Sequence, residues 1–209
     1  MRLSQPTVAG VAAATALALV VAGCGGNKSA TPTKSGSATS STGAASSAPS
    51  SVSSAPAQPG ADYTGWLIQA TDIDAPVPFT GTPPTSNPNG QPGAAVTFNT
   101  QDNSHIIKDT IAVLADAGAA TGALNAAKSG QGGAIKHPAT DPVKVGTDGT
   151  MVSGNSTDGS KGIAVLLFTE GKVLVTLEFD GPADTLPPPD FVSDVGQKQD
   201  AAVKKGLGG

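Results

Sequence analysis

The sequence predicts an α+β domain in which a mostly antiparallel sheet of about five strands packs with two helices, preceded by a signal peptide and a disordered linker. Three observations lead to this prediction. The strongest strand patterns lie side by side at 162–169 and 172–180, separated by a short turn. Two segments, 117–128 and 190–207, have the composition of helices. All aromatic and all acidic side chains lie beyond residue 60, so the apolar core must form there.

The first 23 residues are predicted to be a bacterial lipoprotein signal peptide. Arg2 supplies a positive charge at the start, and the stretch 8–21 is almost entirely alanine, valine, leucine and glycine. That stretch is shorter than the roughly 20 apolar residues that span a bilayer, so it fits the core of a secretory signal. It ends in a tetrapeptide that looks like a lipobox, Val21-Ala22-Gly23-Cys24. The positions that signal peptidase II would recognise are Val21, Ala22 and Gly23.

Cys24 is the predicted site of lipid attachment. A thiol is the strongest nucleophile among ordinary side chains, so it can carry a thioether-linked diacylglyceryl group. Cleavage before Cys24 frees an α-amine that can take a further acyl chain, such as palmitate. Two or three chains, at about 0.8 kcal/mol per buried methylene, make an essentially permanent anchor. We therefore expect the protein to be lipid-anchored at the extracytoplasmic face of the cell membrane, in the cell envelope.

Residues 24–60 are predicted to be the lipidated cysteine and a disordered linker. They are mostly Ser, Thr, Ala, Gly and Pro, with no aromatic or acidic side chain. Such a stretch buries too little apolar surface to offset the entropy of ordering it. As a flexible coil its ends lie roughly 30–35 Å apart, which is enough to hold a domain away from the membrane. Its composition also suits O-glycosylation, which the sequence leaves open.

The domain is predicted to extend over residues 61–209. Its first half carries short β-branched or alternating runs and one alanine-rich run without proline. In order, the elements are a short helix or strand at Trp66-Leu67-Ile68, an irregular loop over 76–92, strands over 94–99 and 106–114, and a helix over 117–128 that ends near Ser129-Gly130.

The second half of the domain holds the strongest patterns. The elements there are extended segments at 143–145 and 151–153 with a turn at 147–150 between them, a polar loop over 155–161, a strand over 162–169, a turn at Glu170-Gly171, a strand over 172–180, a Pro-rich connection over 182–189 and a helix over 190–207. The nearly all-apolar strand 162–169 is expected in the middle of the sheet. The alternation in 172–180 places Val173, Val175, Leu177 and Phe179 on one face.

The anchor, the linker and the opening Trp66 resemble those of actinobacterial, particularly mycobacterial, cell-envelope lipoproteins of the Lpp/Lpq kind. Most of the resemblance lies in 142–207, which begins PVKVGTDGTMVSGNSTDGSKGIAVLLFTEGKVLVTLEF and ends VGQKQDAAVKKGL. This stretch is more loosely similar to extracellular sensor-like domains of mycobacterial receptor kinases. The resemblance implies an extracytoplasmic domain and supplies no catalytic residue. Those sensor domains commonly carry disulfides, whereas a chain with one cysteine forms none internally.

The composition argues against several classes of function. With 12 basic and 16 acidic residues, the chain is an unlikely partner for nucleic acid. One cysteine and two histidines exclude a Cys-rich zinc site and a His-rich metal cluster. The sequence contains no phosphate loop, dinucleotide fingerprint or redox motif. We therefore predict no catalytic residue, metal or cofactor, and expect that the protein is not an enzyme.

Two pairs of residues are still candidates for chemistry. His105 and His137 lie in polar loops, where a histidine is usually solvated, and they form a catalytic pair only if the fold joins them. Glu178 and Asp180 are paired carboxylates of the kind that can transfer protons. Their shared position on the solvent face of one strand is the commoner explanation for such a pair.

Asp148-Gly149 and Asp158-Gly159 suggest a calcium site, because they lie ten residues apart among polar side chains. An EF-hand loop needs ligands at alternate positions and a closing glutamate, which the sequence lacks. Ordinary turn chemistry also explains both dipeptides.

Three functions are compatible with these observations. The first is a membrane-anchored, non-enzymatic domain for interaction or sensing, well packed without a large cavity, with an envelope protein, glycan or lipid as partner. The alternative of a lipid or glycolipid carrier needs an apolar cavity of several hundred Å³. Its walls would be the aliphatic faces around Val165, Leu167, Val173 and Val175. The third, a hydrolase, needs either histidine beside a serine or aspartate in a cleft.

Overall fold

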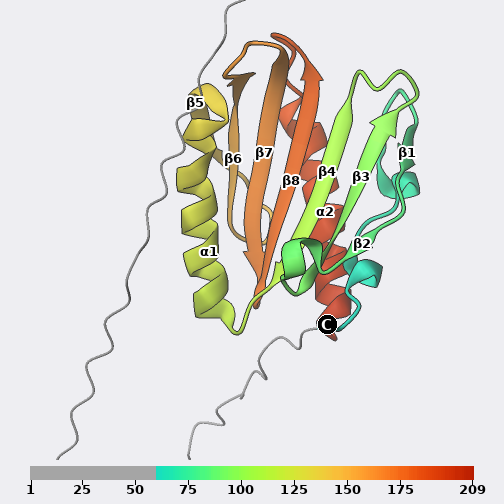
Figure 1. The fold of residues 1–209 in the computed structure, drawn as a ribbon, viewed down its shortest axis with the longest axis vertical. Helices are drawn as coiled ribbons and strands as arrows, with labels where there is room; N and C mark the ends of the chain where they lie inside the picture. The colour runs from blue at the N-terminus through green and yellow to red at the C-terminus, as the bar shows by residue number, and fades with distance from the viewer. Residues whose placement is uncertain (1–59) are drawn as a thin grey trace, which may run out of the picture. The chain divides into compact units, whose positions relative to one another are not determined.

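The structure is a computed structural model that describes residues 60–209. The predicted signal peptide, the lipobox at 21–24 and the linker up to residue 59 lie outside the described residues. The described chain forms one antiparallel sheet with an α-helix on each face (Figure 1). All of its elements pack on this sheet and belong to one compact unit. Residues 60–209 therefore contain a complete core and form a folding unit of their own.

The sheet of the described residues has eight strands, and all paired neighbours run antiparallel. Their spatial order is β1-β3-β4-β8-β7-β6-β5, and β2 pairs with β3. The strands are β1 (Phe79–Gly81), β2 (Thr85–Ser86), β3 (Gly93–Thr100), β4 (Ile106–Val113), β5 (Ile135–Pro142), β6 (Thr147–Ser156), β7 (Lys161–Glu170) and β8 (Val173–Pro182). The helices are α1 (Ala117–Gly130) and α2 (Pro189–Gly206), with 3-10 turns η1 (Thr64–Trp66), η2 (Ala70–Asp72), η3 (Pro88–Gly90) and η4 (Gln131–Gly133).

The α+β class and the antiparallel sheet are confirmed, but the predicted count of about five strands and two helices was too low. β1 and β2 have only three and two residues and lie in the stretch predicted to be an irregular loop. β5 is exposed at every position after Ile135 and contains Pro138 and Pro142, so it shows no alternating apolar pattern. The additional helices are three-residue 3-10 turns, which are too short to leave a periodic signal.

The segment between β5 and β6 was predicted incorrectly. The expected extended segment at 143–145 is a tight bend, in which the Val145 N–H donates to the Val143 carbonyl at 2.9 Å. The expected turn at 147–150 is the beginning of β6, where the pairing with β7 is irregular between Thr147 and Thr150. Asp148 has a φ of 56°, so the Asp-Gly pair supplies a β-bulge rather than a hairpin turn.

The β7–β8 hairpin lies inside the sheet, as the sequence predicts. Glu170 pairs with Val173, so the turn consists of Gly171 and Lys172, one residue later than predicted. Gly171 has a φ of 55°, a left-handed conformation that glycine adopts without strain. The alternating face of β8 is buried as predicted, through Val173, Val175, Leu177 and Phe179.

The two helices bury opposite faces of this hairpin. Leu166 and Phe168 of β7 pack in the core beneath α2, which lies behind the sheet in Figure 1. Val165 and Leu167 face the other way and pack with Leu124 of α1. The two-sided burial explains why β7 is apolar at almost every position, unlike the alternating β8.

A buried glutamine joins the first segment of the described chain to the last helix. The Gln199 side chain, in α2, accepts a hydrogen bond from the Ile68 N–H at 2.9 Å and donates from Nε2 to the Trp66 carbonyl at 2.9 Å. Gln199 is fully buried, so both of these bonds are shielded from water. The bonds hold the N-terminal segment over the same face of the sheet as α2, where it contributes Leu67, Ile68 and Ile73 to the core.

Asp109 in β4 is a fully buried acid on this face of the sheet, between Ile107 and Ile111. Neither of its carboxyl oxygens has a hydrogen-bond partner among the described residues. Burial raises the pKa of Asp109 well above its ordinary value, because the charged form is not solvated. The Ile68 N–H acts in the opposite direction, but it donates its hydrogen bond to Gln199. Asp109 is therefore a destabilising acid in an apolar core.

We expect Asp109→Val to raise the free energy of unfolding at pH 7 by about 1–3 kcal/mol. The unfolded carboxyl ionises near pH 3.9, whereas the folded one holds its proton to higher pH. Wild-type stability should therefore fall as the pH rises above about 4, and the variant should lose this slope. Urea denaturation at pH 4.5 and 7.5 measures both effects, with Asp141→Val on exposed β5 as the control. A variant less stable than the wild type at pH 7.5 would contradict this account.

The two edges of the sheet are unsuited to further pairing. β5 forms one edge, and its pairing with β6 is interrupted between Lys136 and Ala139, where His137 has a φ of 49°. Pro138 and Pro142 within this strand have no N–H to offer. The other edge is the three-residue β1.

Candidate functional site

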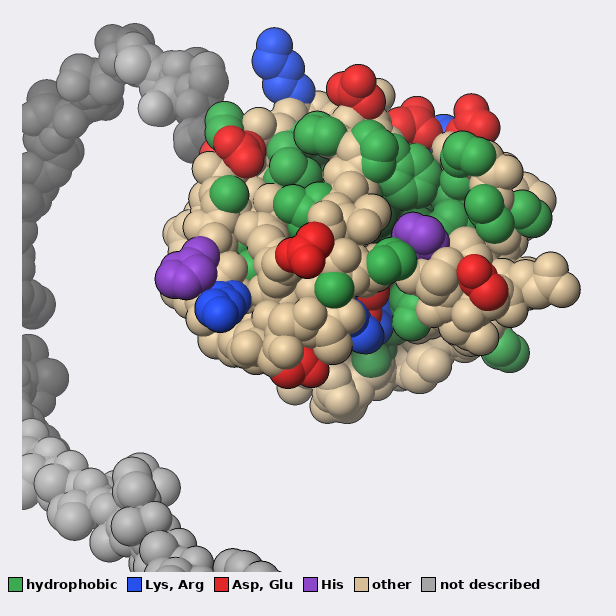
Figure 2. All heavy atoms as spheres, turned by 90° about the horizontal axis from the view of Figure 1, so that it is seen from above, with side chains coloured by type: hydrophobic (Ala, Val, Ile, Leu, Met, Phe, Trp, Pro, Cys, Tyr) green, Lys and Arg blue, Asp and Glu red, His purple; other side chains and the backbone are tan. Residues whose placement is uncertain are grey.

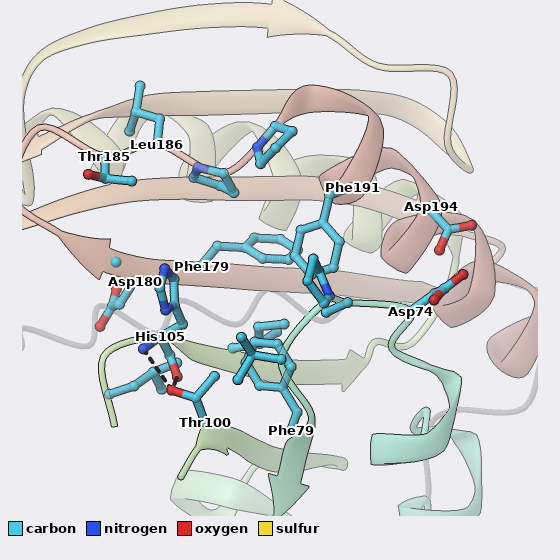
Figure 3. A pocket seen from close by; sticks show the side chains of 18 of the residues that line it. Asp74, Phe79, Thr100, His105, Phe179, Asp180, Thr185, Leu186, Phe191 and Asp194 are labelled. Carbon is cyan, nitrogen blue, oxygen red and sulfur yellow. Dashed lines mark hydrogen bonds between the residues drawn. The ribbon is translucent and has the colours of Figure 1, made fainter. Parts of the chain in front are cut away.

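An apolar cleft of about 600 Å³ lies beside the ends of β4 and β8 (Figure 3). One wall is the segment 74–79 before and at the start of β1, and the opposite wall is the β8–α2 connection with the first turns of α2. The floor consists of Ile106 and Ile107 from β4 and Phe179 and Gly181 from β8. The apolar side chains of the two walls are Val77, Phe79, Leu186 and Phe191.

The walls of the cleft are positioned by prolines and aromatic contacts. Pro187 and Pro188 lie in the β8–α2 connection, and Pro188 has the extended φ and ψ of −57° and 136° that precede a helix beginning with proline. Phe191 on α2 packs edge to face on Phe179, with ring centroids 5.9 Å apart. Val77 and Leu186 remain 51% and 46% exposed on opposite walls, so the rim presents apolar side chains to solvent. Apolar side chains that line one cleft from both walls are typical of a site for a small ligand.

Asp180, at the end of β8, is a buried carboxylate in the lining of the cleft. Its Oδ2 accepts from Lys161 Nζ at 2.9 Å and from Lys108 Nζ at 3.3 Å. Burial raises the pKa of Asp180, but the Lys161 hydrogen bond and the Lys108 charge outweigh it, so the net effect lowers the pKa. Lys108 also pairs with Glu178 at 2.6 Å. Two lysines therefore neutralise the charges of Glu178 and Asp180. The two carboxylates considered for proton transfer belong to an ion-pair cluster.

The opposite end of the cleft carries further acids. Figure 3 shows Asp74 and Asp194 next to each other, beyond the phenylalanine rings. Asp194 Oδ2 pairs with Lys198 Nζ at 2.8 Å, one turn along α2. Asp190 lies in the first turn of α2, where the positive end of the helix dipole stabilises a negative charge. The lining of the cleft includes these three aspartates and Asp180, and it contains no lysine or arginine.

His105 lies in the cleft wall, and His137 does not. His105 belongs to the β3–β4 turn, where its N–H donates to Thr100 Oγ1 at 3.1 Å. His137 lies on the edge strand β5, separated from β4 in the sheet by β8, β7 and β6. The fold therefore does not bring the two histidines together.

The polar contacts of His105 are those of a turn. Ser104 Oγ lies 2.9 Å from His105 Nδ1 and 2.8 Å from Asp102 Oδ1. Hydrogen bonds from Thr100 and Ser104 lower the pKa of Asp102 to about 2, so it is an ionised acceptor that orders the turn. Ser104 and His105 are neighbours in the chain, and Asp102 contacts the serine rather than the histidine. This order differs from a triad, in which the acid orients the histidine.

The two Asp-Gly pairs considered for calcium lie at opposite ends of β6. Asp148 is in the bulge at its start, and Asp158 is the second residue after its end. Hydrogen bonds from Ser156 and Ser160 lower the pKa of Asp158 to about 2 and form the β6–β7 turn. Within residues 60–209, no group of three or more His, Cys, Asp or Glu side chains could hold a metal ion.

The cleft was not predicted from the sequence, and the expected place for a cavity was wrong. Val165, Leu167, Val173 and Val175 are almost completely buried and pack on the two helices. The expectation of a domain without a large cavity is also corrected by the cleft. The only sequence signal is that Val77 and Leu186 are large apolar side chains within Pro-rich stretches.

Comparisons with known proteins add a structural likeness. No family model matches the chain, and no curated protein matches it. Among solved structures, the chain is similar to the extracellular domain of PknH from Mycobacterium tuberculosis, with 10% sequence identity and a TM-score of 0.45. The likeness covers 69% of this chain and 99% of that domain. No function follows from a likeness at this level. None of the helices within 60–209 is long and apolar enough to cross a membrane.

Proposed function

We propose that this protein is a membrane-anchored bacterial lipoprotein whose domain is a non-enzymatic sensor of a small apolar or amphipathic ligand. The lipobox at 21–24 and the low-complexity linker up to residue 60 support the anchor and an extracytoplasmic position. The cleft supports the binding of a ligand. Together they describe a tethered domain that meets its ligand in the cell envelope.

The cleft is the observation that carries this proposal. Its volume of about 600 Å³ lies within the range of sites for small molecules, which is roughly 300–1,000 Å³. Its lining is mostly apolar with a few polar groups at its ends, as such sites require. The apolar rim at Val77 and Leu186 costs solvation free energy in the empty protein, and a ligand that covers it recovers this energy.

A lipid or glycolipid carrier is the second candidate, and the same cleft favours it. A carrier and a sensor differ in whether the ligand leaves the membrane and travels with the protein. Extraction of the 60–209 domain, exported without its anchor from an actinobacterial host, distinguishes them. A stoichiometric lipid in its mass spectrum, absent from an unrelated exported control, would favour the carrier. An extract free of lipid would favour the sensor.

The proposal predicts that Val77→Ser combined with Leu186→Ser weakens binding of an apolar probe about tenfold, or about 1.4 kcal/mol. Both side chains are half exposed, so their replacement removes ligand contacts without removing core contacts. The measurement is fluorescence titration of the neutral dye Nile red with the 60–209 domain. Leu207→Ser is the matched control, because Leu207 is similarly exposed and lies outside the cleft. Equal affinity for the wild type and the double variant would show that the dye does not bind in the cleft.

A further inference from the structure

We infer that the cleft selects ligands with an apolar body and a cationic end, such as an alkylamine or alkylammonium group. This inference deepens the proposed function and rests on it. It follows from where the charged side chains lie around the apolar lining, and from which of them are already paired.

The apolar part of the cleft is a set of three phenylalanines between two polar ends. In Figure 3, Phe79 and Phe191 lie between His105 at one end and Asp74 with Asp194 at the other. Phe179 closes the floor beneath Phe191. An alkyl chain laid along these rings is removed from water, and its end group then lies beside the carboxylates.

The end of the cleft at Asp74 has an excess of negative charge. Lys198 donates a hydrogen bond to Asp194, which raises the pKa of the lysine, and the charges of Asp74 and Asp72 raise it further. One ammonium group thus lies among three carboxylates. Asp74 and Asp190 line the cleft, are exposed, and have no ion-pair partner among the described residues. A cation at this end would complete the charge balance.

An anionic end group finds no partner in the same place. The lining contains no lysine or arginine, and Lys198, the lysine beside this end, is already paired with Asp194. At the other end, Lys108 and Lys161 are paired with acidic side chains of β8. The N-terminus of α2 would otherwise attract an anion, but Asp190 in its first turn already places a carboxylate there. Like charges brought together without a partner disfavour binding, so a fatty acid or an anionic lipid headgroup is excluded from this end.

The aromatic rings favour the same ligand. An ammonium group within about 6 Å of a ring centroid is attracted by the negative face of the ring. Phe79 and Phe191 come from opposite walls, so a ligand between them contacts both. Figure 2 shows the domain from above, with hydrophobic side chains around one of the histidines and separate acidic side chains on the same surface. Charge and ring chemistry therefore specify one ligand class.

Three probes with the same alkyl chain test the inference: decyltrimethylammonium, decanol and decanoate. Each is titrated below its micelle concentration against the 60–209 domain with bound Nile red, at pH 7 and low ionic strength. We expect the cation to displace the dye at a concentration at least tenfold lower than decanoate, with decanol between them. Added salt should reduce this difference, because the carboxylates are exposed.

A pair of variants locates the selectivity. Asp74→Asn with Asp190→Asn should weaken binding of the cation about threefold to tenfold and leave decanol unchanged. Asp141→Asn with Asp148→Asn changes the net charge equally, but neither residue lines the cleft, so it should leave all three affinities unchanged. Equal affinities for the three probes, or tightest binding of decanoate, would overturn the inference while dye binding still supports a ligand site. Dye binding that Val77→Ser with Leu186→Ser does not affect would instead overturn the proposed function itself.

Discussion

Replacement of Cys24 by alanine is expected to abolish lipid attachment completely. Cys24 is the only cysteine in the chain, so no other thiol can take the diacylglyceryl group. Signal peptidase II acts on the lipidated precursor, so the variant should also keep residues 1–23. Radiolabelled palmitate and the intact mass of the protein, in an actinobacterial host, measure the two effects. We expect no label and a heavier polypeptide.

The neighbouring Gly25→Ala is the control for this change, because it follows the predicted cleavage site and retains the thiol. It should be labelled and cleaved like the wild type. Palmitate that remains on the Cys24→Ala protein would contradict the lipobox assignment, and with it the membrane anchoring in the proposed function. It would leave the ligand-binding cleft untouched, since the cleft belongs entirely to residues 74–194.

Replacement of Gly196 by valine should cause a large loss of stability. Gly196 is buried in α2, and a Cβ there would overlap Leu166 Cδ2 and lie 3.3–3.4 Å from the Val145 methyl groups. A valine adds further carbons where α2 meets the sheet, so the buried Leu166 side chain must leave its position or the helix must shift away from β7. We expect the free energy of unfolding to fall by about 3 kcal/mol and the Tm by roughly 6–12 °C. Thermal and urea denaturation of the 60–209 domain measure both.

Gly122→Ala in α1 is the matched control for a helix glycine. A Cβ at Gly122 has no atom within 4 Å, so the change only improves helix propensity. It should raise the free energy of unfolding by about 0.5–1 kcal/mol. A Gly196→Val domain that unfolds at the wild-type temperature would show that α2 does not approach β7 this closely.

The elements that could be predicted from the sequence are those in which the order of apolar and polar side chains follows their burial. The alternation in β8 and the apolar run of β7 depend on local burial, so their positions and faces could be predicted. The edge strand β5 could not, because its partners are backbone groups of β6 and its side chains face solvent. Asp148-Gly149 was predicted to form a turn but forms a bulge, because a residue with a positive φ fits both structures and the sequence alone does not distinguish them.

The candidate site shows a different limit of sequence reasoning. The lipobox is a continuous motif, so the predicted anchor needed only four adjacent residues. The cleft lies between walls that include Val77 and Leu186, which are more than a hundred residues apart in the chain. The walls face each other because α2 and the segment before β1 share one face of the sheet. The fully buried Asp109 was also missed, because an acid within an alternating strand normally indicates the solvent face.

The edge strands β5 and β1 affect whether neighbouring copies of this domain can pair through their sheets. β5 is irregular and contains prolines, and β1 is very short. A lipid anchor confines molecules to two dimensions, where open sheet edges would act as templates for one another. At the β5 edge of the sheet, the regular row of N–H donors is broken by Pro138, by Pro142 and by the interruption after Lys136. At the other edge, β1 has only three residues. On the proposed anchoring, neither edge of the sheet therefore offers a neighbouring molecule a long, regular strand to pair with.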